Sequence, residues 1–171
     1  YLTEHQLISA DQSAYLKKHS TTTCLHRVID DWYCALDEGD IIGACLLDIS
    51  KCFDSINHVL LLKKLELYGI KSVEHDWFRS YLTNRSQKVC CNGQTSEICY
   101  LKTGVPQGSI LGPILFLIFI NDITQNAKLS CCNLFADDAL FYVQGKSTDQ
   151  VQQSLQICID SVASWYDKNC L

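Results

Sequence analysis

Two adjacent carboxylates, Asp137 and Asp138, stand between two apolar runs, and this arrangement constrains the fold more than any other feature of the chain. The runs Cys131 to Ala136 and Ala139 to Val143 each have the length and composition of a β-strand. The simplest geometry is therefore a β-hairpin whose turn holds the two acids. Because Asp is a common turn residue, an ordinary surface turn explains this stretch equally well by itself.

A second apolar run, Asp40 to Asp48, also ends on a carboxylate and is typical of a strand covered on both faces. If the two strand ends are neighbours in one sheet, their acids repel one another unless a divalent cation lies among them. Carboxylate oxygens are ligands that Mg²⁺ prefers, together with water and substrate phosphates. Two such ions about 3.5–4 Å apart are the usual device for in-line phosphoryl transfer in polymerases.

The overall charge does not by itself favour a nucleic-acid partner. The chain has 171 residues, is 47% apolar and 19% charged, and carries a net charge of −5, which fits one globular domain. Phosphates attract Lys and Arg, and these are concentrated in residues 51–102, with 8 Lys and Arg against 5 Asp and Glu. A solvated helix face would produce the same asymmetry. The longest apolar stretch, Pro113 to Ile120, is too short to cross a bilayer, so we expect no membrane partner.

Periodicity and capping residues predict the remaining elements. Asn57 and Ser72 are expected to begin helices, and Asn92-Gly93 is a strong signal for a turn between strands Gln87–Cys91 and Ile98–Leu101. Most of the cysteines stand in apolar runs, so we expect small buried thiols rather than disulfides. Helices are predicted at about 22–37, 57–68 and 113–123, from residue 72 onward, and from Ser147/Thr148 onward. The first of them has its N-cap among Thr21 to Thr23. In the helix that begins at residue 72, the side chains expected to point inward are Val73, Trp77, Tyr81 and Leu82.

The segment from Gly104 to Pro113 holds three glycines and two prolines, which predicts a shaped loop before a buried helix. Such a loop lets backbone approach a ligand closely. A tight connection without a ligand is the alternative.

With these features the chain resembles the reverse transcriptases of non-LTR (LINE-type) retrotransposons, of a jockey-like group. The resemblance covers nearly the whole chain, with its motifs in the family's order. The matching stretches are Gln12-Ser13-Ala14-Tyr15 to Ser20 (fingers-side loop), Leu47-Asp48-Ile49-Ser50-Lys51-Cys52-Phe53-Asp54 (first palm motif), Trp77 to Leu82 with Arg85-Ser86-Gln87 (connecting helix and strand), Gly104 to Pro113 (second motif) and Phe135-Ala136-Asp137-Asp138 (third motif).

The resemblance implies an α+β, two-layer fold: a right-hand polymerase palm with part of the fingers, in which helices back an antiparallel sheet that carries the acids. It implies a partial reverse transcriptase domain over residues 1–171, with about 1–39 on the fingers side and about 40–171 in the palm. We expect thumb and endonuclease to lie outside this chain, in a parent polyprotein that would be its partner. The family also implies an intracellular location, in nucleus and cytoplasm.

The implied function is RNA-directed DNA polymerisation, by transfer of nucleotides from dNTPs to the 3′-OH of a DNA primer on an RNA template. The implied cofactors are two Mg²⁺ ions, with Mn²⁺ as a substitute. Asp48 and Asp137 would hold both metals, Asp138 would assist as a third catalytic acid, and the backbone of Ile49 could face a metal.

Other residues take roles from the same resemblance. Phe53 matches the position that packs against deoxyribose and excludes a ribose 2′-OH. Gln107 and Gly108 match the segment near the template and the incoming nucleotide. Basic residues expected to contact nucleic acid are Lys17, Arg85 and Lys88.

Two alternatives remain open at this point. One is an RNA-dependent RNA polymerase on a similar palm, against which the bulky Phe53 argues. The other is a truncated or domesticated fragment, catalytically inactive, that binds RNA or a protein partner. We expect the isolated chain to be inactive or weakly active.

Overall fold

The computed structural model describes residues 1–49, 51–127 and 130–171, and the chain divides into two compact units. The first unit combines the N-terminal segment, up to Ile49, with most of the chain from Ile120 onward. The second unit is Lys51–Phe119 together with Cys170. Both contain helices and short antiparallel strands, so the predicted α+β class is confirmed.

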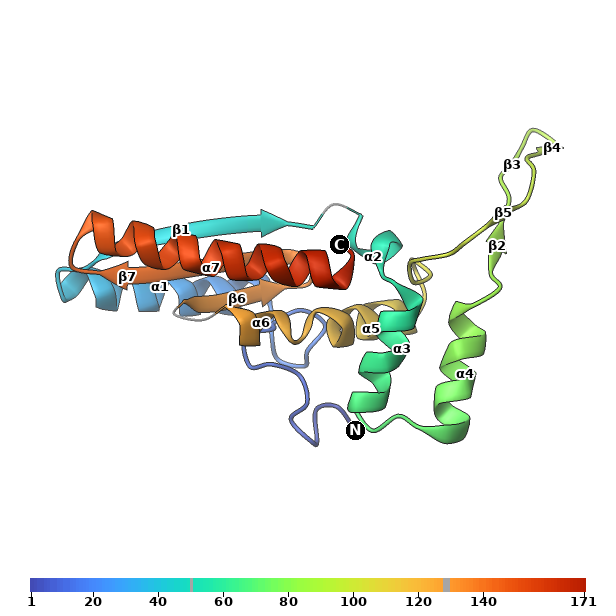
Figure 1. The fold of residues 1–171 in the computed structure, drawn as a ribbon, viewed down its shortest axis with the longest axis horizontal. Helices are drawn as coiled ribbons and strands as arrows, with labels where there is room; N and C mark the ends of the chain where they lie inside the picture. The colour runs from blue at the N-terminus through green and yellow to red at the C-terminus, as the bar shows by residue number, and fades with distance from the viewer. Residues whose placement is uncertain (50, 128–129) are drawn as a thin grey trace. The chain divides into compact units, whose positions relative to one another are not determined.

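Three antiparallel strands form the sheet of the first unit (Figure 1), in the order β1 (Ile41–Asp48), β7 (Asp138–Gly145) and β6 (Cys131–Phe135). The predicted hairpin is present: β6 and β7 are joined by a two-residue turn, with Phe135 opposite Asp138. On its other side β7 pairs with β1 along its whole length, which leaves β1 at an edge of the sheet.

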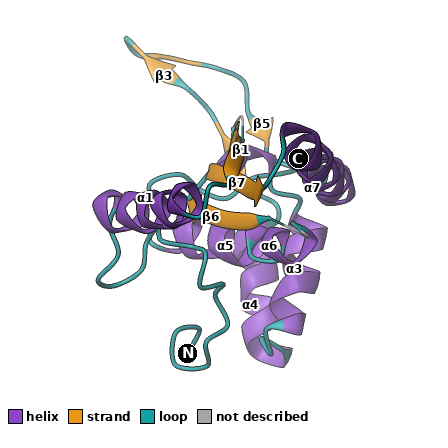
Figure 2. Cartoon of the chain, turned by 90° about the vertical axis from the view of Figure 1, so that its left-hand side faces the viewer, coloured by secondary structure: helices purple, strands orange, loops and turns teal. Residues whose placement is uncertain are grey.

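Helices α1 (Thr21–Asp37) and α7 (Thr148–Asn169) lie on opposite faces of this sheet (Figure 2). On the α7 face Gly43 permits close packing, because a Cβ there would stand 2.5 Å from the side chain of Val151. On the α1 face the rings of Trp32 and Tyr142 meet edge to face, 6.0 Å apart. The Tyr142 hydroxyl donates to Asp31, and burial together with this bond raises the pKa of Tyr142.

The predicted helix starts are correct to within a few residues. The N-cap of α1 is Ser20 rather than one of Thr21 to Thr23, because Ser20 and Thr23 form a reciprocal capping box. At the start of α7, the Ser147 hydroxyl accepts from the backbone N–H of Gln150. A short helix, α6 (Ile123–Asn126), also belongs to this unit.

Four helices and two small β-ribbons make up the second unit. Asn57 caps α3 as predicted, with its side chain accepting from the backbone N–H groups of Val59 and Leu60. The elements are α2 (Cys52–Ser55), α3 (His58–Leu67), α4 (Ser72–Leu82), α5 (Leu111–Ile120, whose last residue belongs to the first unit), the β2–β5 pair (Ser86–Gln87 with Cys99–Tyr100) and the β3–β4 pair (Cys90–Cys91 with Gln94–Thr95).

Several expectations for this unit are wrong in detail. Lys71, not Ser72, is the N-cap of α4. Val73 and Trp77 are 78% and 53% exposed instead of inward, while Leu82 is fully buried. The predicted turn at Asn92-Gly93 is present, but the structure has four two-residue strands in this region instead of the two predicted strands, and all four are exposed. Helix α5 ends at Ile120 rather than near Ile123.

The cysteines are less buried than their apolar surroundings predict. All eleven, each within the described residues, are thiols rather than disulfides, and three of them, Cys52, Cys132 and Cys158, are buried. Burial raises the pKa of the Cys132 and Cys158 thiols. Among the described helices, none combines the length and the apolar character needed to span a bilayer.

Candidate active site

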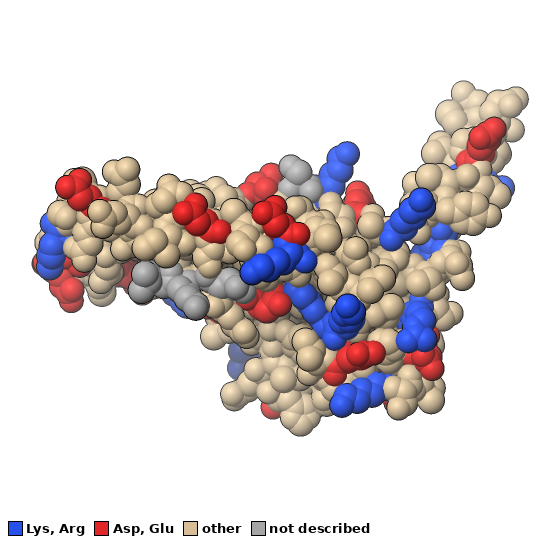
Figure 3. Space-filling view, in the orientation of Figure 1, with Lys and Arg blue, Asp and Glu red and all other residues tan. Residues whose placement is uncertain are grey.

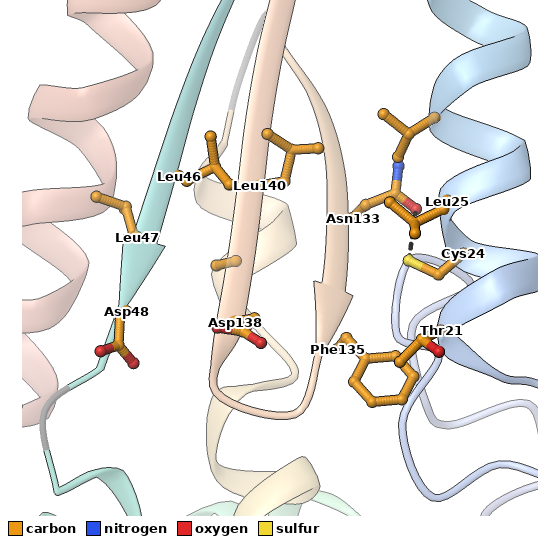
Figure 4. Close-up of a pocket in the computed structure, with 12 residues that line it drawn as sticks. Thr21, Cys24, Leu25, Leu46, Leu47, Asp48, Asn133, Phe135, Asp138 and Leu140 are labelled. Carbon is orange, nitrogen blue, oxygen red and sulfur yellow. Dashed lines mark hydrogen bonds between the residues drawn. The ribbon is translucent and has the colours of Figure 1, made fainter.

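Two of the three predicted catalytic acids face each other at one end of the first unit's sheet (Figure 4). Asp48, the last residue of β1, is the register partner of Asp138, the first residue of β7. Directly opposite residues of an antiparallel pair have Cβ atoms about 4.5–5.5 Å apart, and like charges there are destabilising. Both side chains are exposed, so solvent, a cation or a substrate can reach them.

Asp137 occupies the second position of the β6–β7 turn and is half-buried. The residue before it, Ala136, has φ of 55°, while Asp137 has no positive φ. Positive φ at the first position alone is the pattern of a type II′ turn, which normally places Gly there. For a residue with a Cβ the left-handed region costs about 1–2 kcal/mol, so the surroundings must hold this turn in shape.

Gln12 supplies that support from a distant part of the chain. Its side chain is 2% exposed, and its Oε1 accepts from the backbone N–H of Ala136 at 3.2 Å and of Ala14 at 2.8 Å. The segment around Gln12 lies along the edge of β6 that faces away from β7. There the backbone N–H of Leu134 donates to the carbonyl oxygen of Asp11 at 2.8 Å. Arg27 of α1 anchors the same segment through Asp11, at 2.8 Å. Gln12 is a residue that the sequence analysis assigned only to a loop.

The Gln12→Leu variant should lower the free energy of unfolding by about 1–3 kcal/mol, because two buried backbone donors lose their acceptor while the side-chain volume is kept. Urea unfolding of the chain measures this. Gln152→Leu, on the exposed face of α7, is the matched control and should change stability by less than about 0.5 kcal/mol. Equal stability of the two variants would show that Gln12 does not support the turn.

A cavity of about 510 Å³ lies beside the acids, between α1 and the three strands. Asp48 and Asp138 stand at the hairpin end of the strands, and Leu46 and Leu140 lie farther along them (Figure 4). The Asn133 side chain, also in the wall, accepts from the Cys24 thiol at 3.8 Å. The cavity is thus largely apolar, with carboxylates gathered at one end.

The carboxylate oxygens at this end of the sheet suit a metal ion that keeps water or phosphate oxygens as its remaining ligands. In residues 1–49, 51–127 and 130–171, no three His, Cys, Asp or Glu side chains are placed to hold an ion by themselves. Mg²⁺ commonly uses one or two carboxylates and completes its octahedron with water and substrate phosphates. The facing pair Asp48 and Asp138, with Asp137 next to it, offers such hard oxygen donors. Ile49 follows directly and is buried; its proposed backbone contact stays a prediction.

In the second unit, the first and second motifs are joined by backbone hydrogen bonds. Gly104 N donates to Ile56 O and Val105 N donates to Phe53 O, each at 2.8 Å. Gly104 has φ of 87°, and a Cβ there would lie 2.8 Å from Asp54 O. His58 Nε2 donates to Gly104 O at 2.7 Å. Ser50, which belongs to the first motif, lies outside the described residues.

This junction also gathers the predicted nucleotide-binding residues of the second unit. Gln107 Nε2 donates to Asp54 Oδ1 at 2.8 Å, an interaction that the sequence did not predict. The Phe53 ring is half-buried against Phe116, with centroids 4.7 Å apart. Gly108 has φ of 74° and open space around it. The loop is therefore shaped by its contacts with the first motif.

The predicted nucleic-acid contacts are all exposed. Lys17 belongs to the first unit, and Arg85 and Lys88 to the second. Figure 3 shows Lys and Arg side chains spread over α3, α4 and the base of the β2–β5 ribbon, with fewer acids among them. Arg85, together with Lys51 and Lys102, lines a cavity of about 880 Å³.

Comparison with known proteins identifies the family. Residues 1–171, the whole chain, match the family described as "Reverse transcriptase (RNA-dependent DNA polymerase)". The chain belongs to the reverse transcriptase family. The relatives described next confirm the resemblance to non-LTR retrotransposon enzymes, and the solved structures confirm the polymerase palm.

Relatives of this reverse transcriptase domain include RNA-directed DNA polymerases of mobile elements. It is 30% identical to that of the element jockey from Drosophila funebris in an alignment 161 residues long, which covers 90% of this chain and 18% of the relative. A similar match is the Pol polyprotein of the retrotransposable element R2 from Popillia japonica, 30% identical in an alignment 115 residues long, which covers 60% of this chain and 19% of the relative. The domain thus spans less than a fifth of these relatives' length.

Solved telomerase structures share the fold. A telomerase from Candida tropicalis, solved with a fragment of telomeric RNA, superposes with a TM-score of 0.65 at 15% identity, covering 92% of this chain and 30% of that one. The apo telomerase of the same organism, truncated from its C-terminal domain, gives a TM-score of 0.61 at 16% identity, covering 90% of this chain and 32% of that one. This likeness concerns the fold alone.

Proposed function

We propose that this chain is the catalytic part of an RNA-directed DNA polymerase, which adds deoxynucleotides to a DNA primer on an RNA template. The observation that carries the proposal is the register of the sheet, which sets Asp48 opposite Asp138 beside the Asp137 turn. The test is Mg²⁺-dependent primer extension by the protein that contains this chain, with an RNA template, a DNA primer and dNTPs.

In this proposal Asp48 and Asp137 hold two divalent ions, with Asp138 assisting, and the half-buried turn keeps Asp137 in place. Two bound Mg²⁺ ions, or Mn²⁺ in their stead, would lower the pKa of the primer 3′-OH and stabilise the charge on the triphosphate and the departing pyrophosphate. The protein's contribution is position and charge rather than covalent chemistry. The RNA template, the primer and the remaining parts of a parent polyprotein are the proposed partners.

Phe53→Val should let the enzyme incorporate ribonucleotides, because removal of the ring opens space for a 2′-OH. The ratio of kcat/KM for dNTP over rNTP should fall by about 10–100-fold, as expected when steric selection in a pocket is lost. Phe53→Tyr keeps the ring and is the control, with selection close to that of the unmodified enzyme. An unchanged ratio in Phe53→Val would remove the steric role of this residue.

A further inference from the structure

Three side chains form a ladder: Trp77 and Tyr81 lie on helix α4, and Arg85 lies in the segment between α4 and β2. The rings of Trp77 and Tyr81 are stacked, with centroids 5.5 Å apart and planes within 9° of parallel. The guanidinium of Arg85 lies over the Tyr81 ring, 5.5 Å from its centroid. Residues spaced four apart share one side of a helix, which explains the alignment of the aromatic pair.

The outer end of this ladder is an exposed but fixed aromatic ring. Trp77 is 53% exposed, although its periodicity predicts a buried position. The Phe78 ring stands at 88° to the indole, with centroids 5.1 Å apart, so Trp77 contacts two aromatic neighbours on its own helix. A large, rigid aromatic surface left open to solvent is a feature of binding sites rather than of cores.

The inner end of the ladder is basic. Arg85 lines the 880 Å³ cavity together with Lys51 and Lys102, and Asp54 is the one carboxylate in its lining. Arg79, on helix α4, forms an ion pair with Asp76 at 3.1 Å and so contributes less net charge. The ladder therefore runs from an open indole to a group of cations.

We propose that the Trp77–Tyr81–Arg85 ladder binds single-stranded RNA, a role that rests on the proposed polymerase function because the occupant is the unpaired template. Sites for single strands combine aromatic rings, on which bases stack, with cations that follow the phosphates. A base stacks on the exposed part of the Trp77 ring, and the strand's phosphates approach Arg85 and the basic cavity. The cations at the inner end favour a nucleic acid over an apolar protein partner.

Binding of a fluorescent 12-nucleotide oligo(U) to the chain, followed by anisotropy at low salt, tests this. Trp77→Ala should weaken binding about 10-fold, since loss of one stacked base has about this effect. Trp77→Phe keeps a stacking ring and should stay within about threefold of the unmodified chain. Val73→Ala, at an exposed apolar position of the same helix, should change nothing. Arg85→Gln should weaken binding and lower the slope of log K against log salt by about 0.7, the value for one phosphate contact.

Circular dichroism confirms that each variant is folded. Unchanged affinity in both Trp77→Ala and Arg85→Gln would overturn the proposal, and so would tighter binding of oligo(dT) or of duplex RNA than of oligo(U). Primer extension separates this inference from the proposed function. If the protein has no polymerase activity but Trp77→Ala still weakens oligo(U) binding, the proposed function fails and the ladder remains an RNA-binding site. If the protein is an active polymerase but Trp77→Ala leaves oligo(U) binding unchanged, the proposed function stands and the ladder is not an RNA-binding site.

Discussion

Replacing Asp137 or Asp48 by Ala should abolish primer extension by the protein that contains this chain. Each carboxylate is proposed to hold metal ions that stabilise charge in the transition state, a contribution of several kcal/mol. About 4 kcal/mol corresponds to a rate loss of about 1,000-fold, since each 1.36 kcal/mol is tenfold. The measurement is single-turnover extension of a DNA primer by one nucleotide, with Mg²⁺ and with Mn²⁺. Extension by either variant at near the unmodified rate would exclude the assigned role.

The structure also predicts that the loss at Asp48 does not come from unfolding. Because Asp48 stands opposite Asp138, its neutralisation removes a like-charge pair. Asp48→Asn should therefore raise the free energy of unfolding of the metal-free chain by about 0.2–1 kcal/mol, the range for cross-strand pairs. Titration with Mg²⁺ should stabilise the unmodified chain and have less effect on this variant. A destabilised Asp48→Asn chain would contradict the cross-strand arrangement.

The second large effect concerns Gly104, where the two motifs of the second unit touch. An Ala Cβ at this position would lie 2.8 Å from Asp54 O, 2.9 Å from Asp54 Cα and 3.0 Å from Phe53 O. These are backbone atoms, so they cannot move aside as a flexible side chain would, and the φ of 87° adds strain. We expect Gly104→Ala to lower the free energy of unfolding by about 3 kcal/mol or more, as measured by urea unfolding.

Gly108 provides a matched control in the same loop. Its φ is 74°, but a Cβ there would meet nothing within 4 Å. Gly108→Ala therefore carries only the backbone strain, about 1–2 kcal/mol. The difference between the two variants isolates the close approach of the loop to the first motif. Equal losses would mean that the loop does not approach the backbone of Phe53 and Asp54 this closely.

Local patterns predicted the parts of the fold that depend on neighbours in sequence. The apolar runs on either side of Asp137 and Asp138 gave the correct hairpin, and Asn57 began a helix because its side chain caps the next turn. Periodicity groups residues on one face without saying which face is buried. Trp77 and Val73 were placed inward for that reason, and the structure leaves both exposed.

The missed contacts connect residues far apart in the chain. Gln12 supports a turn at Ala136, and Gln107 meets Asp54 across the junction of two motifs. Hydrogen bonds between residues far apart in the chain produce no periodic pattern in the sequence. The sequence therefore does not distinguish a buried Gln from an exposed one in a loop. The catalytic roles proposed for Asp48, Asp137 and Asp138 rest on the family motif, because the described residues contain no group of three such side chains placed to hold a metal ion by themselves.

The position of β1 has a consequence for handling the protein in solution. In the described part of the chain, no other strand pairs with the outer edge of β1, and Leu46 near its end is 78% exposed. An open edge beside apolar side chains is a template for pairing with a second molecule. Concentrated samples should therefore self-associate through intermolecular β-structure, and a charged substitution on this strand, such as Leu46→Lys, should improve colloidal stability.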